Sequence, residues 1–194
     1  SLAVPEARGK LFGEPVQISG STRNDGAVVF EASGGITPAA ARQHWESPLF
    51  AHLSGLAAWR STIQVRGGGA AVVVESSLDG LASSLPSPLN KSAADEWPLK
   101  VEMDLQPAAA GDRIRVSLGN VGAAEVLGHG GQEGWRATRG AIALHQPVKL
   151  PDKGLSFRAT LPEVDIDAWR RIGRQTGVAT AAPPTGPFAC DREE

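Results

Sequence analysis

The sequence has few of the residues on which several kinds of protein depend. It contains one cysteine among 194 residues, no tyrosine and one methionine. The single thiol, Cys190, cannot close a disulfide within the chain, and one thiol alone does not make a metal cluster. The composition therefore gives no support for a disulfide scaffold or a cysteine-based metal site.

Positive charge is not in excess either, because 19 basic residues are set against 21 acidic ones. Proteins that hold nucleic acid or an anionic membrane surface by charge need a net positive surface, so we expect no nucleic acid partner. No apolar run approaches the ~20 residues needed to cross a bilayer, and residues 1–5 lack the features of a signal peptide. We expect membrane contact only through parts of a longer protein outside this chain.

What the sequence does contain is hydrophobic content of 41%, with 23 glycines and 14 prolines. The apolar fraction is sufficient for a buried core, and frequent glycine and proline indicate many turns between short strands. We therefore predict a mostly β fold in which helix is the minority.

Strict alternation of apolar and polar residues is the clearest local signal. Residues 99–106 alternate without a break, and residues 113–118 repeat the pattern after the turn-forming Pro107 and Gly111. Successive side chains of a strand point to opposite faces, so this pair predicts a hairpin with one aliphatic face. The other face carries a ladder of charged side chains, namely Lys100, Glu102, Asp104, Arg113 and Arg115.

The same alternation recurs along the chain, in residues 16–19, 59–66, 141–145 and 155–161. Gly67-Gly68-Gly69 separates residues 63–66 from the apolar run 71–75 and suits a tight hairpin turn. We predict an antiparallel meander with about eight to ten strands of the usual ~5 residues.

Two short helices and a tail interrupt or follow the strands. Thr37-Pro38 is typical of a helix start and predicts a helix through Trp45, with a further turn over 49–53. Asp165 is the expected cap of a second helix that ends at Gly173. We therefore divide the chain into a β segment over 1–173 and a linker or disordered tail over 174–194, where the composition favours disorder.

No catalytic, metal or cofactor site is indicated. The four histidines are scattered, and none is spaced to place two metal ligands together on one element. Glu163, Asp165 and Asp167 could bind a cation, but helix capping by Asp165 explains the cluster more simply. The serines include no nucleophile elbow. We expect a non-enzymatic protein with no cofactor and no metal.

Two features have more than one interpretation at this stage. Residues 81–89 are apolar but contain two prolines, which predicts a loop across the sheet that either plugs a groove or closes the end of a core. The five tryptophans are more typical of large core anchors than of a ligand cage. They are Trp45, Trp59, Trp97, Trp135 and Trp169.

The segment VESSLDGLASSLPSPLNKSAADEWPL, over residues 74–99, resembles a recurring stretch of the YhdP branch of the AsmA-like envelope proteins. Leu53-Ser54-Gly55 before Trp59, and Leu161-Pro162 before residues 165–170, are similar to other parts of that branch. The resemblance covers about residues 9–173. It implies a very long protein of Gram-negative bacteria that is anchored in the inner membrane, extends through the periplasm and carries phospholipid along an apolar β-groove. With the resemblance, we expect a curved antiparallel meander that forms a groove-like sheet.

This chain would then be an internal piece, with phospholipid acyl chains and neighbouring segments of the same long protein as its partners. The expected groove lining is Ile63, Val65, Leu99, Val101, Met103, Leu105, Ile114, Val116, Leu118, Ile142, Leu144, Leu155 and Phe157. Periodicity alone favours the core of a β-sandwich for these side chains, and the resemblance reverses that order. A periplasmic scaffold or protein-interaction domain that transports nothing is the alternative function.

Overall fold

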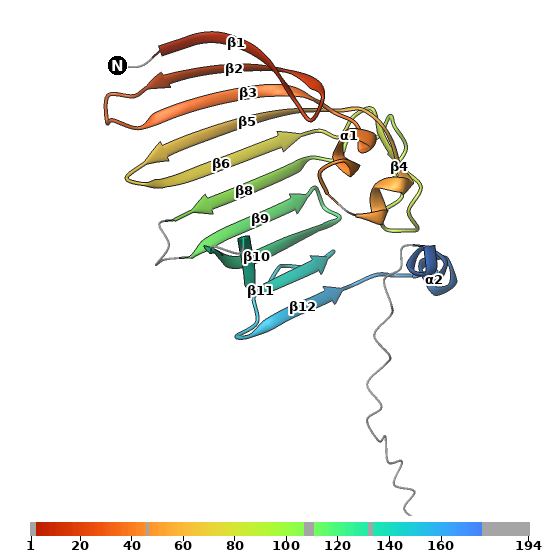
Figure 1. The fold of residues 1–194 in the computed structure, drawn as a ribbon. Coiled ribbons are helices and arrows are strands. Elements are labelled where there is room, and N and C mark those ends of the chain that lie inside the picture. The colour runs from red at the N-terminus through yellow and green to blue at the C-terminus, as the bar shows by residue number, and fades with distance from the viewer. Residues whose placement is uncertain (1–2, 46, 107–110, 132–133, 176–194) are drawn as a thin grey trace, which may run out of the picture.

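A computed structural model describes residues 3–45, 47–106, 111–131 and 134–175. Its main feature is one open sheet in which nearly every strand pairs with its neighbours along the chain (Figure 1). In spatial order the strands are β1 (Ala3–Leu11), β2 (Glu14–Thr22), β3 (Val28–Ile36), β5 (Ala57–Arg66), β6 (Gly69–Ser76), β8 (Leu99–Leu105), β9 (Asp112–Leu118), β10 (Gly122–Gly131), β11 (Gly134–Leu144) and β12 (Gly154–Ala159). The predicted fold class, a mostly antiparallel meander with two short helices, is confirmed.

The last pair of strands departs from the meander, because β12 runs parallel to β11. A parallel pair needs a connection that returns along the sheet, here residues 145–153. Ala141 and Ala143 are 3% and 1% exposed, whereas Ile142 between them is 49% exposed. Alternate residues of a strand face opposite sides, so the connection covers the face that carries the two alanines and leaves the Ile142 face open.

A small cap, residues 37–55 and 77–98, stands at one end of the strands. It contains α1 (Pro38–Arg42), the 3-10 helix η1 (Pro48–His52) and a two-stranded sheet of β4 (Leu53–Gly55) and β7 (Leu81–Ser83). Leu85 is buried in the cap, and so is Lys91, whose Nζ donates to Leu81 O at 2.7 Å and Ser92 O at 3.0 Å. The loop predicted over residues 81–89 therefore begins with a short strand and helps to build the cap.

The first helix is shorter than predicted. Thr37 caps α1 as expected, with Oγ1 accepting from Ala40 N at 3.2 Å, but the helix ends at Arg42. The rings of His44 and Trp45 instead pack against Phe12, His44 tilted and Trp45 edge-on, with centroids 4.4 and 5.0 Å from it. Contact between aromatic rings thus replaces the last predicted turn.

The second helix, α2 (Ile166–Gln175), continues two residues beyond the predicted end. Asp165 caps it, with Oδ1 accepting from Ala168 N at 2.8 Å. Trp169 Nε1 donates to Ser87 O at 3.0 Å, which attaches the helix to the cap. The predicted tail lies outside the described residues, apart from the end of this helix.

Candidate functional site

Each of the ten strands contributes apolar side chains to one shared face of the sheet. The strand register aligns them in rows that cross the sheet, one residue from each strand. One row reaches from β1 to β12 and consists of Ala7, Ile18, Ala32, Ser61, Val74, Val101, Val116, Ala124, Ile142 and Phe157. Ser61 is the one polar member. A chain of contacts between directly opposite side chains therefore connects both edges of the sheet.

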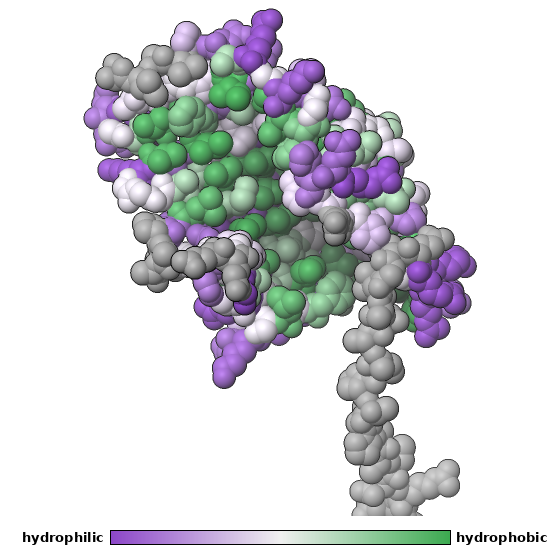
Figure 2. Space-filling view, viewed as in Figure 1, coloured by the Kyte–Doolittle hydropathy of each residue, from purple (hydrophilic) through white to green (hydrophobic). Residues whose placement is uncertain are grey.

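A second row lies beside the first, two residues further along each strand. It runs from β2 to β12 through Gly20, Phe30, Ile63, Val72, Met103, Ile114, Val126, Gly140 and Leu155. Every member is apolar or glycine. Figure 2 looks onto this face and shows apolar side chains spread over the sheet, with polar side chains gathered at its margins.

All thirteen predicted lining residues lie on this face, which we call the apolar face. Their positions alternate within β5, β8, β9, β11 and β12, and the pairing registers bring them to the same side. Four of them, Val65, Ile142, Leu155 and Phe157, are exposed, and the other nine are half-buried. A sandwich core would be sealed by a second sheet, so among the described residues this is not the interior of a sandwich.

The prediction missed several members of the apolar face. Val28 and Phe30 on β3 alternate just as the chosen residues do, and this signal could have been read. Val72 and Val74 belong to a run of three valines, in which the sequence does not say which residues share a face. Ala124 and Val126 lie on β10, where glycine and alanine weaken the alternation.

The opposite face, which we call the polar face, carries the predicted charge ladder. Lys100 Nζ lies 3.0 Å from Glu102 Oε1, and Arg115 Nη2 donates to Asp104 Oδ2 at 3.1 Å. The hydrogen bond from Lys100 lowers the pKa of the Glu102 carboxyl by more than desolvation raises it, and the charges of Lys100 and Arg115 lower it further. This face is therefore suited to water.

A hollow of about 1260 Å³ lies on the polar face near the cap end of the strands. Seven of its lining residues form one cross-strand row, namely Arg8, Gln17, Ser33, Arg60, Glu75, Lys100 and Ser117. Each cation in the row has an acidic neighbour, because Arg8 pairs with Glu6, Lys100 with Glu102, and Arg60 stands opposite Glu75. The hollow thus has no dominant charge to select a ligand.

The other candidate residues do not converge on a site. Among the described residues, no three His, Cys, Asp or Glu side chains are close enough to hold a metal ion together. Trp59, Trp97 and Trp169 are half-buried, but Trp45 and Trp135 are exposed, so the prediction that all five are core anchors is wrong for these two. Trp135 lies over Gly128 and donates from Nε1 to Asp112 Oδ2 at 2.9 Å.

In the part of the chain that the structure describes, neither α1 nor α2 has the length and apolar character that crossing a bilayer would need. The family described as YhdP protein matches residues 2–191, nearly the whole sequence. The chain belongs to the YhdP family. Membership makes it a non-enzymatic envelope protein of the lipid-transport type. No curated protein and no solved structure matches the chain.

Proposed function

We propose that this chain is a periplasmic segment of a long protein, anchored in the inner membrane, that conducts phospholipid between the inner and outer membranes. The observation that carries the proposal is the apolar face, on which two rows of apolar side chains cross the sheet with no second sheet over them in the described residues. Acyl chains would lie on this face, and the polar face would meet water.

The dimensions of the face suit a lipid track. Ten strands at the usual spacing make a strip ~43 Å long, and the apolar residues of β5, from Ala57 to Val65, span ~27 Å along the strand. Each methylene group that leaves water contributes about 0.8 kcal/mol. Because neighbouring positions in a row are chemically alike, an acyl chain can move from one strand to the next without meeting a polar barrier.

The edges of the sheet are where the track would continue. Strand β12 presents Leu155 and Phe157 at an edge that has no further strand among the described residues. Neighbouring segments of the same long chain would extend the apolar face there and beside β1, and membrane contact would be made by parts of the protein outside this chain.

The test compares two variants, each of which places one negative charge on a different face of the sheet. Val101→Asp puts a carboxylate in the middle of the apolar face, and Val73→Asp makes the same change on the polar face of the neighbouring strand. Burying an unpaired carboxylate against hydrocarbon is strongly unfavourable, so Val101→Asp should reduce crosslinking to a photoreactive phospholipid at least tenfold. Val73→Asp should leave crosslinking within about twofold of the unaltered chain.

Circular dichroism of both variants shows whether the sheet remains folded. Equal crosslinking of the two variants, or unfolding of Val101→Asp alone, would mean that the apolar face is a structural core and not a lipid track.

One observation favours the alternative, a scaffold that transports nothing. Trp45 and Leu49 are exposed on the cap, Leu56 is exposed just beyond it, and the ring of Trp45 packs edge-on against Phe12. Exposed aromatic and aliphatic groups of this kind are typical of protein interfaces. Native mass spectrometry distinguishes the two functions, because copurified phospholipid supports the track and a lipid-free mass with a defined protein partner supports the scaffold.

A further inference from the structure

The apolar face is most exposed at β11 and β12. Ile142 is 49% exposed, Phe157 65% and Leu155 80%, and Val164 and Ile166 just before and within α2 are exposed as well. Burial of such side chains is favourable, so the three that β11 and β12 leave in water mark a docking area.

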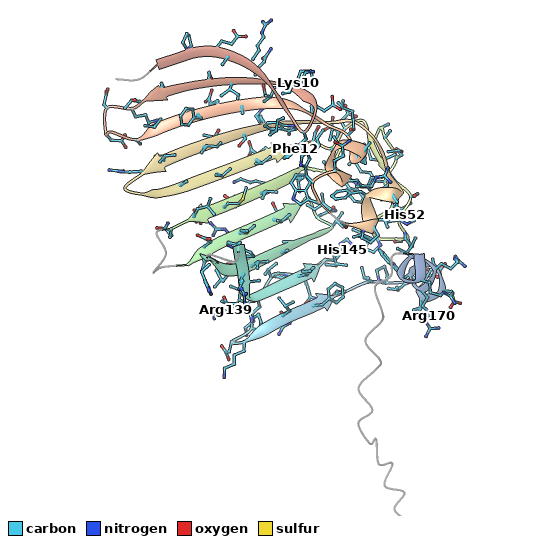
Figure 3. The ribbon with its side chains drawn as sticks, viewed as in Figure 1. Lys10, Phe12, His52, Arg139, His145 and Arg170 are labelled. Atoms are coloured by element: carbon cyan, nitrogen blue, oxygen red, sulfur yellow. The ribbon has the colours of Figure 1, made fainter. Side chains whose placement is uncertain are left out.

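Helix α2 lies beyond the end of β12 and is held there by contacts at both ends of the preceding segment. Thr160 N donates to Leu144 O at 3.1 Å, which keeps the chain beside β11 as it leaves β12. Five residues later, Asp165 caps α2, and Trp169 attaches the helix to the cap through Ser87. Figure 3 places Arg170 on α2, beyond the end of β12.

The exposed side of α2 is basic. Arg170, Arg171 and Arg174 are exposed, and Asp167 is the one acidic residue of the helix. Oδ1 of Asp167 lies 3.7 Å from Nη1 of Arg170, so Asp167 forms an ion pair with Arg170. Within the described residues, neither Arg171 nor Arg174 forms an ion pair or a hydrogen bond through its side chain. Two guanidinium groups are therefore free to bind an anion.

We propose that Arg171 and Arg174 bind the phosphate of a phospholipid whose acyl chains lie on the exposed end of the apolar face, over Leu155 and Phe157. The inference rests on the proposed function and adds to it the place where the head group is held. Guanidinium groups match phosphate oxygens in charge and in paired hydrogen-bond geometry. A positive helix next to exposed aliphatic and aromatic groups complements both parts of an anionic lipid.

The test compares two lipids that differ only in the head group. Photoreactive phosphatidylglycerol and photoreactive diacylglycerol, with the same acyl chains, are offered in neutral detergent micelles to the whole chain. The double variant Arg171→Glu with Arg174→Glu should reduce capture of phosphatidylglycerol at least fivefold and leave capture of diacylglycerol within twofold. Replacing both residues with lysine should retain most of the phosphatidylglycerol capture, because lysine keeps the charge.

The matched control is Arg8→Glu with Arg60→Glu, which makes the same change of charge on the polar face and should leave capture of both lipids unaltered. Equal loss of both lipids in the α2 variant, or no loss of either, would overturn the inference. Equal capture of both lipids by the unaltered chain would also overturn it, while the proposed function would stand. Capture of neither lipid by the unaltered chain would overturn both.

Discussion

Two apolar stretches of this chain, the cap segment over residues 81–89 and strand β12, have opposite fates. The cap segment is irregular and contains two prolines, yet it provides a leucine that is only 6% exposed. Strand β12 alternates regularly, yet its Leu155 and Phe157 are mostly in water. Alternation thus predicts which residues share a face, whereas burial depends on whether another layer covers that face.

The largest expected effect comes from removing an apolar side chain in each place. Leu85→Ala leaves a cavity in the cap and should lower the free energy of unfolding by about 2–4 kcal/mol. Leu155→Ala removes the same atoms from an exposed site and should change it by less than about 0.5 kcal/mol. Urea denaturation measures both values. Similar values for the two variants would mean that β12 is covered in solution.

The next effect tests how tightly the cap is built. Gly55 has a φ of +99°, and a Cβ there would overlap the carbonyl oxygen of Gly80. Gly55→Ala should therefore destabilise the chain by about 1–3 kcal/mol. Gly67 also has a positive φ, but no atom lies within 4 Å of its Cβ position. Gly67→Ala therefore measures the destabilisation caused by the positive φ alone, without a steric overlap. We expect thermal denaturation to show a clearly larger loss for Gly55→Ala.

A smaller effect is expected at the buried lysine of the cap. Lys91→Met keeps the length of the side chain but leaves the carbonyl oxygens of Leu81 and Ser92 without this donor. Loss of hydrogen bonds from a charged donor should lower the free energy of unfolding by about 1–2 kcal/mol. Hydrogen exchange should then be faster in β4 and β7 and unchanged in β9. Faster exchange throughout the sheet would show that the cap and the sheet unfold as one unit.

The smallest effect concerns the polar face. In the folded chain the pKa of the Glu102 carboxyl is lowered from its reference value of 4.5. The stability that this carboxylate contributes is therefore present above pH 4.5 and is lost as the pH falls through the folded pKa. Glu102→Gln should therefore be slightly destabilising at neutral pH, and less so at an acid pH where the carboxyl is protonated in both the folded and the unfolded chain. Urea denaturation at both pH values checks this, and a larger effect in acid would contradict the sign.

Sequence alone could predict most of the sheet because apolar and polar side chains alternate over long stretches of β5, β8 and β9. Strand β10 was not predicted, because Gly122, Ala124 and Gly128 on its apolar face differ little in hydrophobicity from their neighbours in the sequence. Strand β1 was not predicted either, because Pro5 argues against a strand and the pairing register shifts between Val4 and Ala7, so no regular alternation results. These strands form because their neighbours supply a template of unpaired backbone groups, which a local pattern does not record.

The sequence could predict on which side of the sheet the chosen residues lie, but not how exposed they are. All thirteen chosen residues share one face because period-two alternation fixes the side on which each one lies. The parallel pairing of β12, the position of the cap and the attachment of α2 all depend on contacts between residues far apart in the sequence. Whether a face is covered is decided by those distant contacts.

The attachment of α2 also has a consequence for the order of folding. Trp169 and Ser87 are separated by 82 residues, whereas most strand pairs join consecutive segments. Contacts of such long range carry a large loop-closure entropy and form after local hairpins. The indole of Trp169 should therefore reach its partner only once the hairpins from β8 to β11 and the cap exist, which makes this hydrogen bond a marker of the completed chain.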